Sequence, residues 1–472
     1  MSRADPVSSA PPPGPVPRLG PLRKAIYASG DFTVNASLVA LAMLYTSHFL
    51  LEVAELRPLL AGLVPLIGRV IDAFADPLMG RISDRTRWRW GRRRPWFLLG
   101  ALPFGVTFAL LWIDVPFEST GLRFAYYALI YLLHALAMTV ISVPYLAILP
   151  EMALDYDART SLHTYRAIGA MLGVFAAVSL RWIAGALGGG TQGWAAMGVL
   201  VGLGLALPWL AVHRVTFERP AFAARPAHTG FFAGLRIAWR HRTFRQLTTA
   251  FVMGRIAIDL VSALMILYTT WWIGRSEDFE PLMFTFLASV LLALPVWLRV
   301  ARGRDKARLF VVGSLWWSAS SLLLLFVQPD WPRWLLFAFV PVIGVGYAAV
   351  DVMPWSMLGE VIDEGDEATG ERREGLYTGF FTFLRKLGGS LGVFLVLGLI
   401  DLFGFVSGAE RQGESALQAI RWLTALAPPV FLAIGVWVLR GYPLTRARHE
   451  EIVRALAERA PVPPAGPGAR AG

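Results

Sequence analysis

The chain contains no cysteine, and only 16% of its 472 residues are charged. The absence of cysteine excludes disulfide bonds, thiolate metal sites and cysteine nucleophiles. The low charge is unlike that of soluble proteins, in which about a quarter of the residues are charged. Lysine is also rare, because only Lys24, Lys306 and Lys386 stand among the 44 basic residues. Nearly every positive charge is therefore an arginine.

Several motifs of enzymes and nucleotide-binding proteins are also missing. The chain has no GxxxxGK[ST] sequence for the phosphates of ATP, no HExxH sequence and no cluster of histidine and cysteine. We therefore expect no ATP-driven step, no enzyme activity and no cofactor. A formal charge of +11 would favour a nucleic-acid partner in a soluble protein, but the basic loops described below account for it without one.

Apolar residues, by contrast, make up 56% of the chain. They occur in blocks of about 20–30 residues, the length of a helix that crosses a ~30 Å hydrocarbon layer. The roughly ten-residue alternation of a membrane β-barrel does not occur. We predict an all-α membrane protein with twelve transmembrane helices. Their expected ranges are 25–50, 57–83, 95–114, 121–151, 162–187, 194–213, 246–273, 281–300, 308–327, 333–361, 376–402 and 417–440.

The loops between these blocks alternate in charge. RTRWRWGRRR (85–94), RHRTFR (240–245) and ARGRDKAR (301–308) lie on one side, whereas DVPFEST (114–120) and AGALGGGTQG (184–193) on the other side carry no Lys or Arg. Basic loops remain in the cytoplasm during membrane insertion. Because the number of predicted spans is even, we expect a multi-pass protein of the cell membrane with both termini in the cytoplasm.

The longest internal loop divides the chain into two six-helix halves. We predict a disordered Pro-rich tail over 1–20, a first bundle over 21–213, a cytoplasmic loop over 214–243, a second bundle over 244–440 and a cytoplasmic tail over 441–472. The loop ends in a basic stretch that we expect at the membrane surface, and 445–460 reads as a short amphipathic helix. The basic loop 301–308 weakly repeats the loop 85–94, and internal repeats are common in secondary transporters.

The sequence DAFADPLMGRISD (72–84) places two carboxylates inside a predicted span. Arg69, Asp72 and Asp76 lie three and four residues apart and so share one helical face. Facing lipid, they would cost on the order of 8–10 kcal/mol together. We expect them to face a cavity, where the carboxylates bind a small cation such as Na⁺ or one of them takes up a proton. The alternative is a purely structural ion-pair cluster.

Other polar residues fall inside predicted spans. A lysine in mid-membrane, in a chain so biased toward arginine, indicates that a compact, titratable ammonium is needed at Lys386. Arg255 and Asp259 lie one turn apart and could neutralise each other, and His134 fits a packed, hydrogen-bonded role. We predict a charge network of Arg69, Arg255, Asp259, Asp351 and Glu360, and a cytoplasmic gate of Asp84, Arg85, Arg92 and Arg93.

Two long motifs carry a family resemblance. DAFADPLMGRISDRTRWRWGRRRPWFLLG and EATGERREGLYTGFFTFLRKLGGSLG (367–392) resemble signatures of the glycoside–pentoside–hexuronide:cation symporters, which belong to the major facilitator superfamily. The resemblance implies the major facilitator fold. It also implies a cation site and a substrate site. The cation site would contain Asp72, Asp76, Thr139 and, at the departing position, Ser142; the substrate site would contain Asp31, Asn35, Arg166 and Lys386.

The chain departs from the pattern of the sugar-transporting members of that family on span four. Those members have an aspartate and a tryptophan where this chain has Ser142 and Leu146, and some have a polar cation ligand where it has Ala75. Because of these departures, the sequence does not decide whether the coupling cation is Na⁺ or H⁺. It also does not identify the sugar.

The expected function is cation-coupled symport of a sugar or glycoside by alternating access of the two halves. An alternative on the same fold is symport of a lysolipid or similar amphiphile, which a less polar cavity would suit. A third possibility is a non-transporting membrane sensor. We expect a small-molecule substrate and a chain that acts as a monomer.

Overall fold

The computed structural model describes residues 19–153, 156–218, 231–370 and 373–459, and these residues are largely helical. The described residues form fifteen α-helices, and several of these continue into a segment of another helix type. The predicted tail 1–20 and the end of the tail 441–472 fall mostly outside the described residues. The helices of the first part of the chain are α1 (Pro21–Ala40, continued by a π-helix Leu41–Val53), α2 (Pro58–Arg85), α3 (Arg94–Leu111), α4 (Thr120–Met152), α5 (Tyr156–Val178), α6 (Leu180–Ala186) and α7 (Gly190–Val215).

The second part of the chain begins with α8, a helix too short to cross a membrane. The helices are α8 (Phe231–Arg240), α9 (Arg242–Leu267, continued by Tyr268–Trp272), α10 (Phe279–Ala301), α11 (Lys306–Leu322), α12 (Arg333–Thr369), α13 (Glu374–Leu402), α14 (Glu414–Val438) and α15 (Arg446–Arg459). The amphipathic helix predicted over 445–460 is confirmed as α15.

Eleven helices of the described chain are long and apolar enough to cross a membrane, and a bent pair makes a twelfth. That pair is α5 and α6, which meet at an angle of 46°. Ser179 stands at the break, and its Oγ donates a hydrogen bond to the Phe175 carbonyl oxygen one turn earlier at 3.3 Å. Such back-bonding often bends helices. The prediction of an all-α membrane protein with twelve spans is therefore confirmed.

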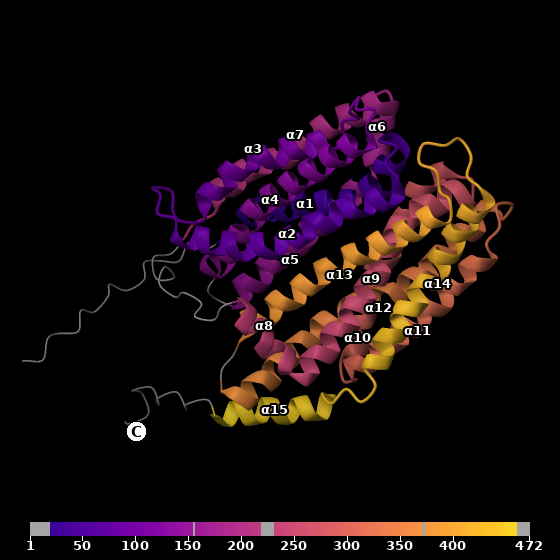
Figure 1. Cartoon of the computed structure of the whole chain (residues 1–472). Helices are drawn as coiled ribbons and strands as arrows, with labels where there is room; N and C mark the ends of the chain where they lie inside the picture. Colours follow the sequence, from indigo (N-terminus) through magenta and orange to yellow (C-terminus); the bar gives the residue numbers. More distant parts are fainter. Residues whose placement is uncertain (1–18, 154–155, 219–230, 371–372, 460–472) are drawn as a thin grey trace, which may run out of the picture.

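The spanning helices form two bundles (Figure 1). Helices α1 to α7 form the first bundle, drawn in indigo and magenta, and helices α9 to α14 form the second bundle. The segments 85–94, 301–306 and 438–446 lie at one end of the molecule, which we call the basic end. The connections 111–120, 186–190 and 402–414 lie at the opposite end.

Glycines let two helix pairs approach closely and position polar side chains. In the first bundle, a β-carbon at Gly169 of α5 would lie 2.4 Å from the Ala28 carbonyl oxygen of α1. In the second, a β-carbon at Gly389 of α13 would lie 1.8 Å from Asp259 Oδ2 of α9. Only glycine has room at such contacts. The α1–α5 and α9–α13 pairs are therefore fixed at short distance, and both carry charged residues.

The two bundles meet along α2 and α13, which lie side by side (Figure 1). A β-carbon at Gly62 of α2 would lie 2.9 Å from the Phe394 Cα atom of α13, so the backbones touch in the half of the pair nearest the opposite end. Further contacts at the opposite end join the bundles. They are Arg57–Asp401 (2.9 Å), Arg181–Glu280 (2.7 Å), Trp271–Glu52 (2.9 Å) and Ser407–Leu56 O (2.6 Å).

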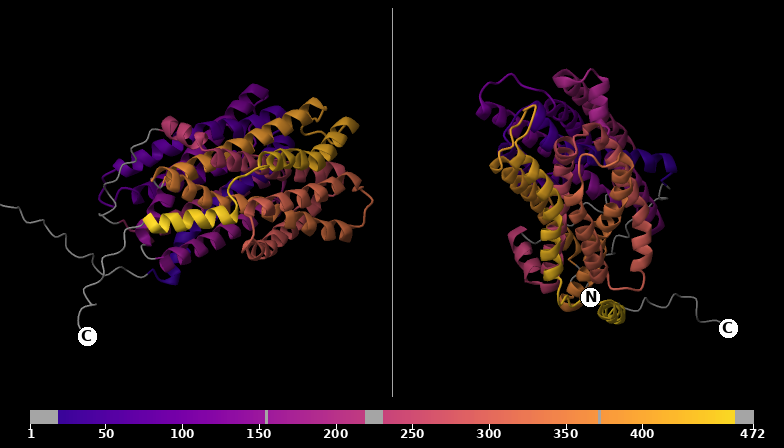
Figure 2. Two further views of the ribbon diagram at one scale, coloured as in Figure 1. Left: turned by 90° about the horizontal axis from the view of Figure 1, so that it is seen from below. Right: turned by 90° about the vertical axis from the view of Figure 1, so that its right-hand side faces the viewer.

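Helix α15 lies across the basic end of the second bundle (Figure 2). His449 Nε2 lies 3.1 Å from Asp363 Oδ2, and Arg448 donates a hydrogen bond to Glu367 at 2.8 Å. Both carboxylates belong to the end of α12, which extends beyond the predicted span 333–361 to Thr369. The C-terminal helix is therefore held by ion pairs to α12.

Candidate functional site

A charged group lies where α2, α4 and α13 meet, and we call it the aspartate cluster. Arg69 Nη1 lies 3.0 Å from Asp72 Oδ2 on the same helix. Thr139 Oγ1 of α4 donates a hydrogen bond to Asp76 Oδ1 at 2.7 Å. Lys386 Nζ of α13 lies 2.8 Å from Asp76 Oδ2 and 4.0 Å from Asp72 Oδ2. Residues predicted as a cation site are thus brought together, and Lys386 adds a charge from the second bundle.

The two carboxylates of the aspartate cluster differ in their surroundings. The side chain of Asp72 is 2% exposed, whereas that of Asp76 is 32% exposed. Asp72 Oδ1 is buried and has no hydrogen-bond partner among the residues that the structure describes. A buried acceptor that lacks a partner costs about 1–3 kcal/mol, and more when it is charged. A small cation beside Asp72 and Asp76 would satisfy that oxygen, so the donor set fits a hard cation with oxygen ligands.

Ser142, on span four, lies one turn after Thr139 on α4 and is half-buried. No hydrogen bond from its side chain to another described residue is present. The structure therefore brings Thr139, but not Ser142, into direct contact with the carboxylates.

A second charged group lies inside the first bundle between α1, α4 and α5. Arg166 donates to both oxygens of Asp31, with Nε–Oδ2 at 2.6 Å and Nη2–Oδ1 at 2.9 Å. Tyr145 also donates its hydroxyl to Asp31 Oδ2 at 2.6 Å, and its ring stacks on Tyr27 at 4.4 Å. Asn35 instead donates to the backbone oxygen of Asp31 at 2.8 Å. We did not predict Tyr145 as a site residue. Its position three residues after Ser142, in the same part of span four, was the one indication in the sequence.

A third charged group lies in the second bundle. Arg255 Nε lies 3.1 Å from Asp259 Oδ2, and Arg255 Nη1 lies 3.6 Å from Asp351 Oδ1. The expected pairing of Arg255 with Asp259 is confirmed. Arg385 interacts electrostatically with Arg255, Asp259 and Asp351. It stands next to Lys386 in the same motif, but we had predicted no role for it.

Glu360 lies outside these groups, contrary to our expectation of a single charge network. Its carboxylate lies 2.7 Å from Lys306 Nζ at the basic end of the second bundle. Nine residues of α-helix separate Glu360 from Asp351, a rise of roughly 13 Å at about 1.5 Å per residue. The pair Lys306–Glu360 therefore belongs to the end of the bundle, where the loop 301–306 packs against α12.

The predicted gate residues make their described contacts within the first bundle. Arg93 Nη2 lies 2.8 Å from Asp84 Oδ1, and both Arg92 and Arg93 contact Glu151 at the end of α4. Glu218 accepts hydrogen bonds from the backbone N–H groups of Arg92, Arg93 and Arg94 at 2.9, 2.8 and 3.1 Å.

These contacts hold the basic loop against α4 and the segment after α7. The role of the four residues as a cytoplasmic gate stays a prediction. Arg85 is exposed and makes no ion pair with a described residue. Glu151, which is 1% exposed, and Glu218 were not foreseen, because only the folded chain brings them to the loop.

His134 has the packed role that we expected. It is 1% exposed, and its ring nitrogens lie 2.7 Å from Ser37 Oγ and 3.0 Å from Thr107 Oγ1. Both nitrogens therefore have hydrogen-bond partners within the first bundle.

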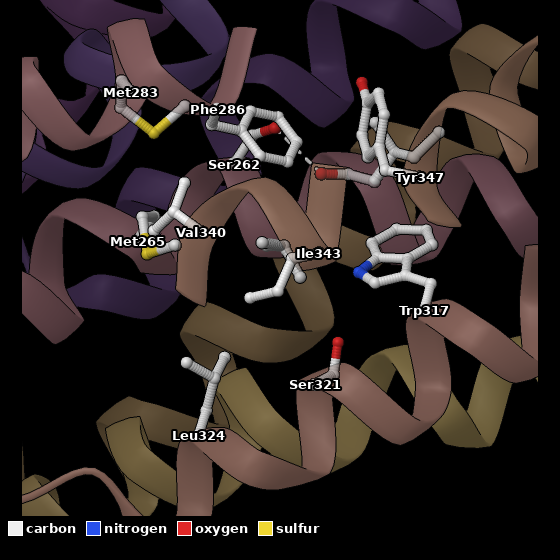
Figure 3. A pocket seen from close by; sticks show the side chains of 12 residues that line it. Ser262, Met265, Met283, Phe286, Trp317, Ser321, Leu324, Val340, Ile343 and Tyr347 are labelled. Atoms are coloured by element: carbon white, nitrogen blue, oxygen red, sulfur yellow. Dashed lines mark hydrogen bonds between the residues drawn. The ribbon is translucent and has the colours of Figure 1, made fainter. Parts of the chain in front are cut away.

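A separate apolar pocket lies within the second bundle, between α9, α10, α11 and α12 (Figure 3). Met265, Met283, Phe286 and Ile343 line it, with Tyr347 at one side. None of the charged residues described above lines the pocket. Tyr347 interacts electrostatically with Arg255 and Asp351, so it lies between the pocket and the third charged group.

The chain is similar to known transporters over nearly its whole length. A family model described as MFS/sugar transport protein matches residues 26–446. An uncharacterized symporter of Synechocystis sp. is 28% identical, over 92% of this chain and 96% of that protein. The sodium-dependent lysophosphatidylcholine symporter 1 of Mus musculus is 24% identical, over 93% of this chain and 89% of that protein.

A solved structure supports the fold. The crystal structure of a D-xylose-proton symporter matches with a TM-score of 0.68 at 13% identity, covering 90% of this chain and 98% of that one. The major facilitator fold and the resemblance to symporters, both expected from the two motifs, are confirmed. Since the family model spans most of the sequence, the chain belongs to the MFS/sugar transport protein family.

Proposed function

We propose that this membrane protein is a symporter that couples a cation, bound at Asp72 and Asp76, to the uptake of a small-molecule substrate. The observation that carries the proposal is the contact of Lys386 with Asp76, because it joins the two bundles at the carboxylates. Alternating access requires a contact between the two bundles whose strength changes when the cation binds. The aspartate cluster provides such a contact.

The cluster suggests a sequence of events. Without a cation, the Lys386 ammonium neutralises Asp76 and ties α13 to α2. A cation that binds Asp76 and the unpartnered Asp72 Oδ1 takes the place of the ammonium. The displaced ammonium no longer holds the bundles in this arrangement, so cation binding shifts the balance between conformations.

We propose Na⁺ as the cation. Two carboxylates and the Thr139 hydroxyl offer oxygen ligands, the type that hard cations prefer. The sodium dependence named for the murine relative supports the same choice. Transport that is equally fast without Na⁺ and follows a proton gradient would instead favour H⁺.

The basic end would face the cytoplasm, because its loops carry the excess of arginine. Both ends of the chain would then be cytoplasmic. The ion pairs Arg57–Asp401 and Arg181–Glu280 close the opposite, external end between the bundles. The conformation would therefore be one that is closed to the outside.

A sugar or glycoside is the first substrate class. Asp31, Arg166 and Tyr145 form a compact set of carboxylate, guanidinium and hydroxyl groups, all of which bind sugar hydroxyls. A lysolipid is the second class, and the similarity to the lysophosphatidylcholine symporter of Mus musculus favours it.

Sodium-driven uptake into proteoliposomes tests the proposal. Radiolabelled glycosides and lysolipids are offered with an inward Na⁺ gradient, with K⁺ in place of Na⁺, and with a proton gradient alone. We expect accumulation only with Na⁺, and its loss in Asp76→Asn. The matched control is Asp330→Asn, an exposed loop residue, which should accumulate like the unmodified protein. Accumulation in Asp76→Asn at the unmodified rate would contradict the proposal.

A further inference from the structure

Among the arginines of the three charged groups, Arg385 is the one whose side chain forms no hydrogen bond with a described residue. It precedes Lys386 on α13 and is half-buried. Its Nε atom is buried without a hydrogen-bond partner, and the side chain makes no hydrogen bond or ion pair with a described residue. The arginines at 69, 166 and 255, by contrast, each bind an aspartate.

Both acidic neighbours of Arg385 also lie next to Arg255, and only Asp259 is hydrogen-bonded to it. Asp259 binds Arg255 through both of its oxygens, and Asp351 lies 3.6 Å from the same guanidinium. Arg385 therefore interacts electrostatically with two carboxylates, Asp259 and Asp351, and with two like charges, Arg255 and Arg69, without a hydrogen bond to any described residue. Buried donors without acceptors are unfavourable, and a charged donor more so than a neutral one. The site is short of one acceptor.

Electrostatic balance points to the kind of acceptor. The three charged groups contain five basic and five acidic side chains, so they are neutral as a set. They are Arg69, Arg166, Arg255, Arg385 and Lys386, and Asp31, Asp72, Asp76, Asp259 and Asp351. A bound Na⁺ would add one positive charge. A substrate with one negative charge would restore neutrality.

We propose that Arg385 is an anion-binding subsite and that the transported substrate carries a carboxylate or phosphodiester group with a net charge of −1. The inference rests on the proposed symport, since the anion enters with the cation. The planar guanidinium suits this group, because two parallel N–H donors match two oxygens of a carboxylate or phosphate. The same chemistry occurs in a sugar acid and in a lysolipid head group, and the test separates them.

Two pairs of probes, each with an anionic and a neutral member, test the subsite. The sugar pair is p-nitrophenyl β-D-glucuronide and p-nitrophenyl β-D-glucoside. The lipid pair is lysophosphatidylglycerol and monoacylglycerol, assayed after an albumin wash that removes lipid from the vesicle surface. Sodium-driven uptake of each radiolabelled probe by proteoliposomes gives kcat/KM. We expect the full-length protein to prefer the anionic member of one pair.

Substitution of Arg385 should reduce that preference. We expect Arg385→Gln to lower the ratio of kcat/KM for the anionic over the neutral member by roughly tenfold or more, the size of one charge-assisted hydrogen bond. Arg385→Lys should have an intermediate ratio, because the ammonium keeps the charge but lacks the fork. Arg308→Gln removes an exposed arginine and should keep the ratio of the unmodified protein.

Three results would overturn the inference. Preference of the unmodified protein for the neutral members, with Na⁺-dependent uptake intact, would remove the anion site and leave the proposed symport standing. An equal loss for both members in Arg385→Gln, which leaves the ratio unchanged, would show that Arg385 only supports the fold. Absence of Na⁺-dependent uptake of all four probes would contradict the proposed symport and this inference with it.

Discussion

Lys386 Nζ lies 2.8 Å from Asp76 Oδ2, and this contact links α13 of the second bundle to α2 of the first. The same ammonium is 4.0 Å from Asp72 Oδ2. A single side chain from one bundle thus neutralises a pair of carboxylates in the other.

Lys386→Arg should reduce Na⁺-driven accumulation at least about tenfold, although the charge is kept. The guanidinium is planar and wider than an ammonium, so it cannot lie between two carboxylates in the same position. Uptake and exchange are measured side by side in proteoliposomes. Near-normal accumulation by this variant would remove Lys386 from the coupling mechanism, and Lys306→Arg at the basic end serves as the matched control.

Ser142→Asp should change the cation dependence of uptake. Residue 142 lies one turn from Thr139, which contacts Asp76, so a carboxylate at 142 could reach the same cation. We expect the Na⁺ concentration for half-maximal uptake to fall by about fivefold or more, as one added charged ligand of 1–3 kcal/mol would give. If the Na⁺ curve of Ser142→Asp coincides with that of the unmodified protein, residue 142 does not reach the site.

Tyr145→Phe should weaken substrate binding and leave cation dependence unaltered. The lost hydroxyl donates to Asp31, and a hydrogen bond to a charged group contributes about 1.5–3 kcal/mol. We expect KM for the substrate to rise roughly tenfold or more. Tyr126→Phe is the control, since its hydroxyl binds a backbone oxygen elsewhere in the first bundle. Equal KM values in the two variants would exclude Tyr145 from substrate binding.

Arg181→Gln should destabilise the contacts that close the end of the molecule opposite the basic end. Glu280 is fully buried, and loss of its partner leaves an uncompensated charge, which costs about 3–5 kcal/mol in buried pairs. Because the chain has no cysteine, spin labels at Glu118→Cys and Glu410→Cys report the distance between the bundles at that end. We expect the longer distances to gain population in Arg181→Gln. An unchanged distance distribution would mean that the pair does not hold this end closed.

The transmembrane spans and part of the candidate site could be predicted from the sequence. Blocks of apolar residues determine the helices, and spacings of three and four place Arg69, Asp72 and Asp76 on one face of α2. Tyr145 was not foreseen, because aromatic residues on apolar helices more often pack than bind. Arg385 stands beside Lys386 in the same motif, and what distinguishes it is that its side chain has no hydrogen-bond partner among the described residues.

The remaining departures arise at the helix ends. Helix α12 continues to Thr369, beyond the predicted end at 361, so Glu360 lies with Lys306 near the basic end. The partners of the basic loop, Glu151 and Glu218, are distant from it in sequence, so its charge pattern alone does not identify them. Apolar periodicity does not report where a helix stops once it leaves the membrane.

The central claim is that Asp72 and Asp76 bind the coupling cation, and direct binding of ²²Na⁺ to the purified protein tests it most closely. We predict one saturable site per chain in the unmodified protein. Asp72→Asn and Asp76→Asn should each weaken Na⁺ binding at least about tenfold, because each removes a charged ligand. Asp330→Asn should bind like the unmodified protein. Saturable ²²Na⁺ binding of unchanged affinity in both cluster variants would contradict the account.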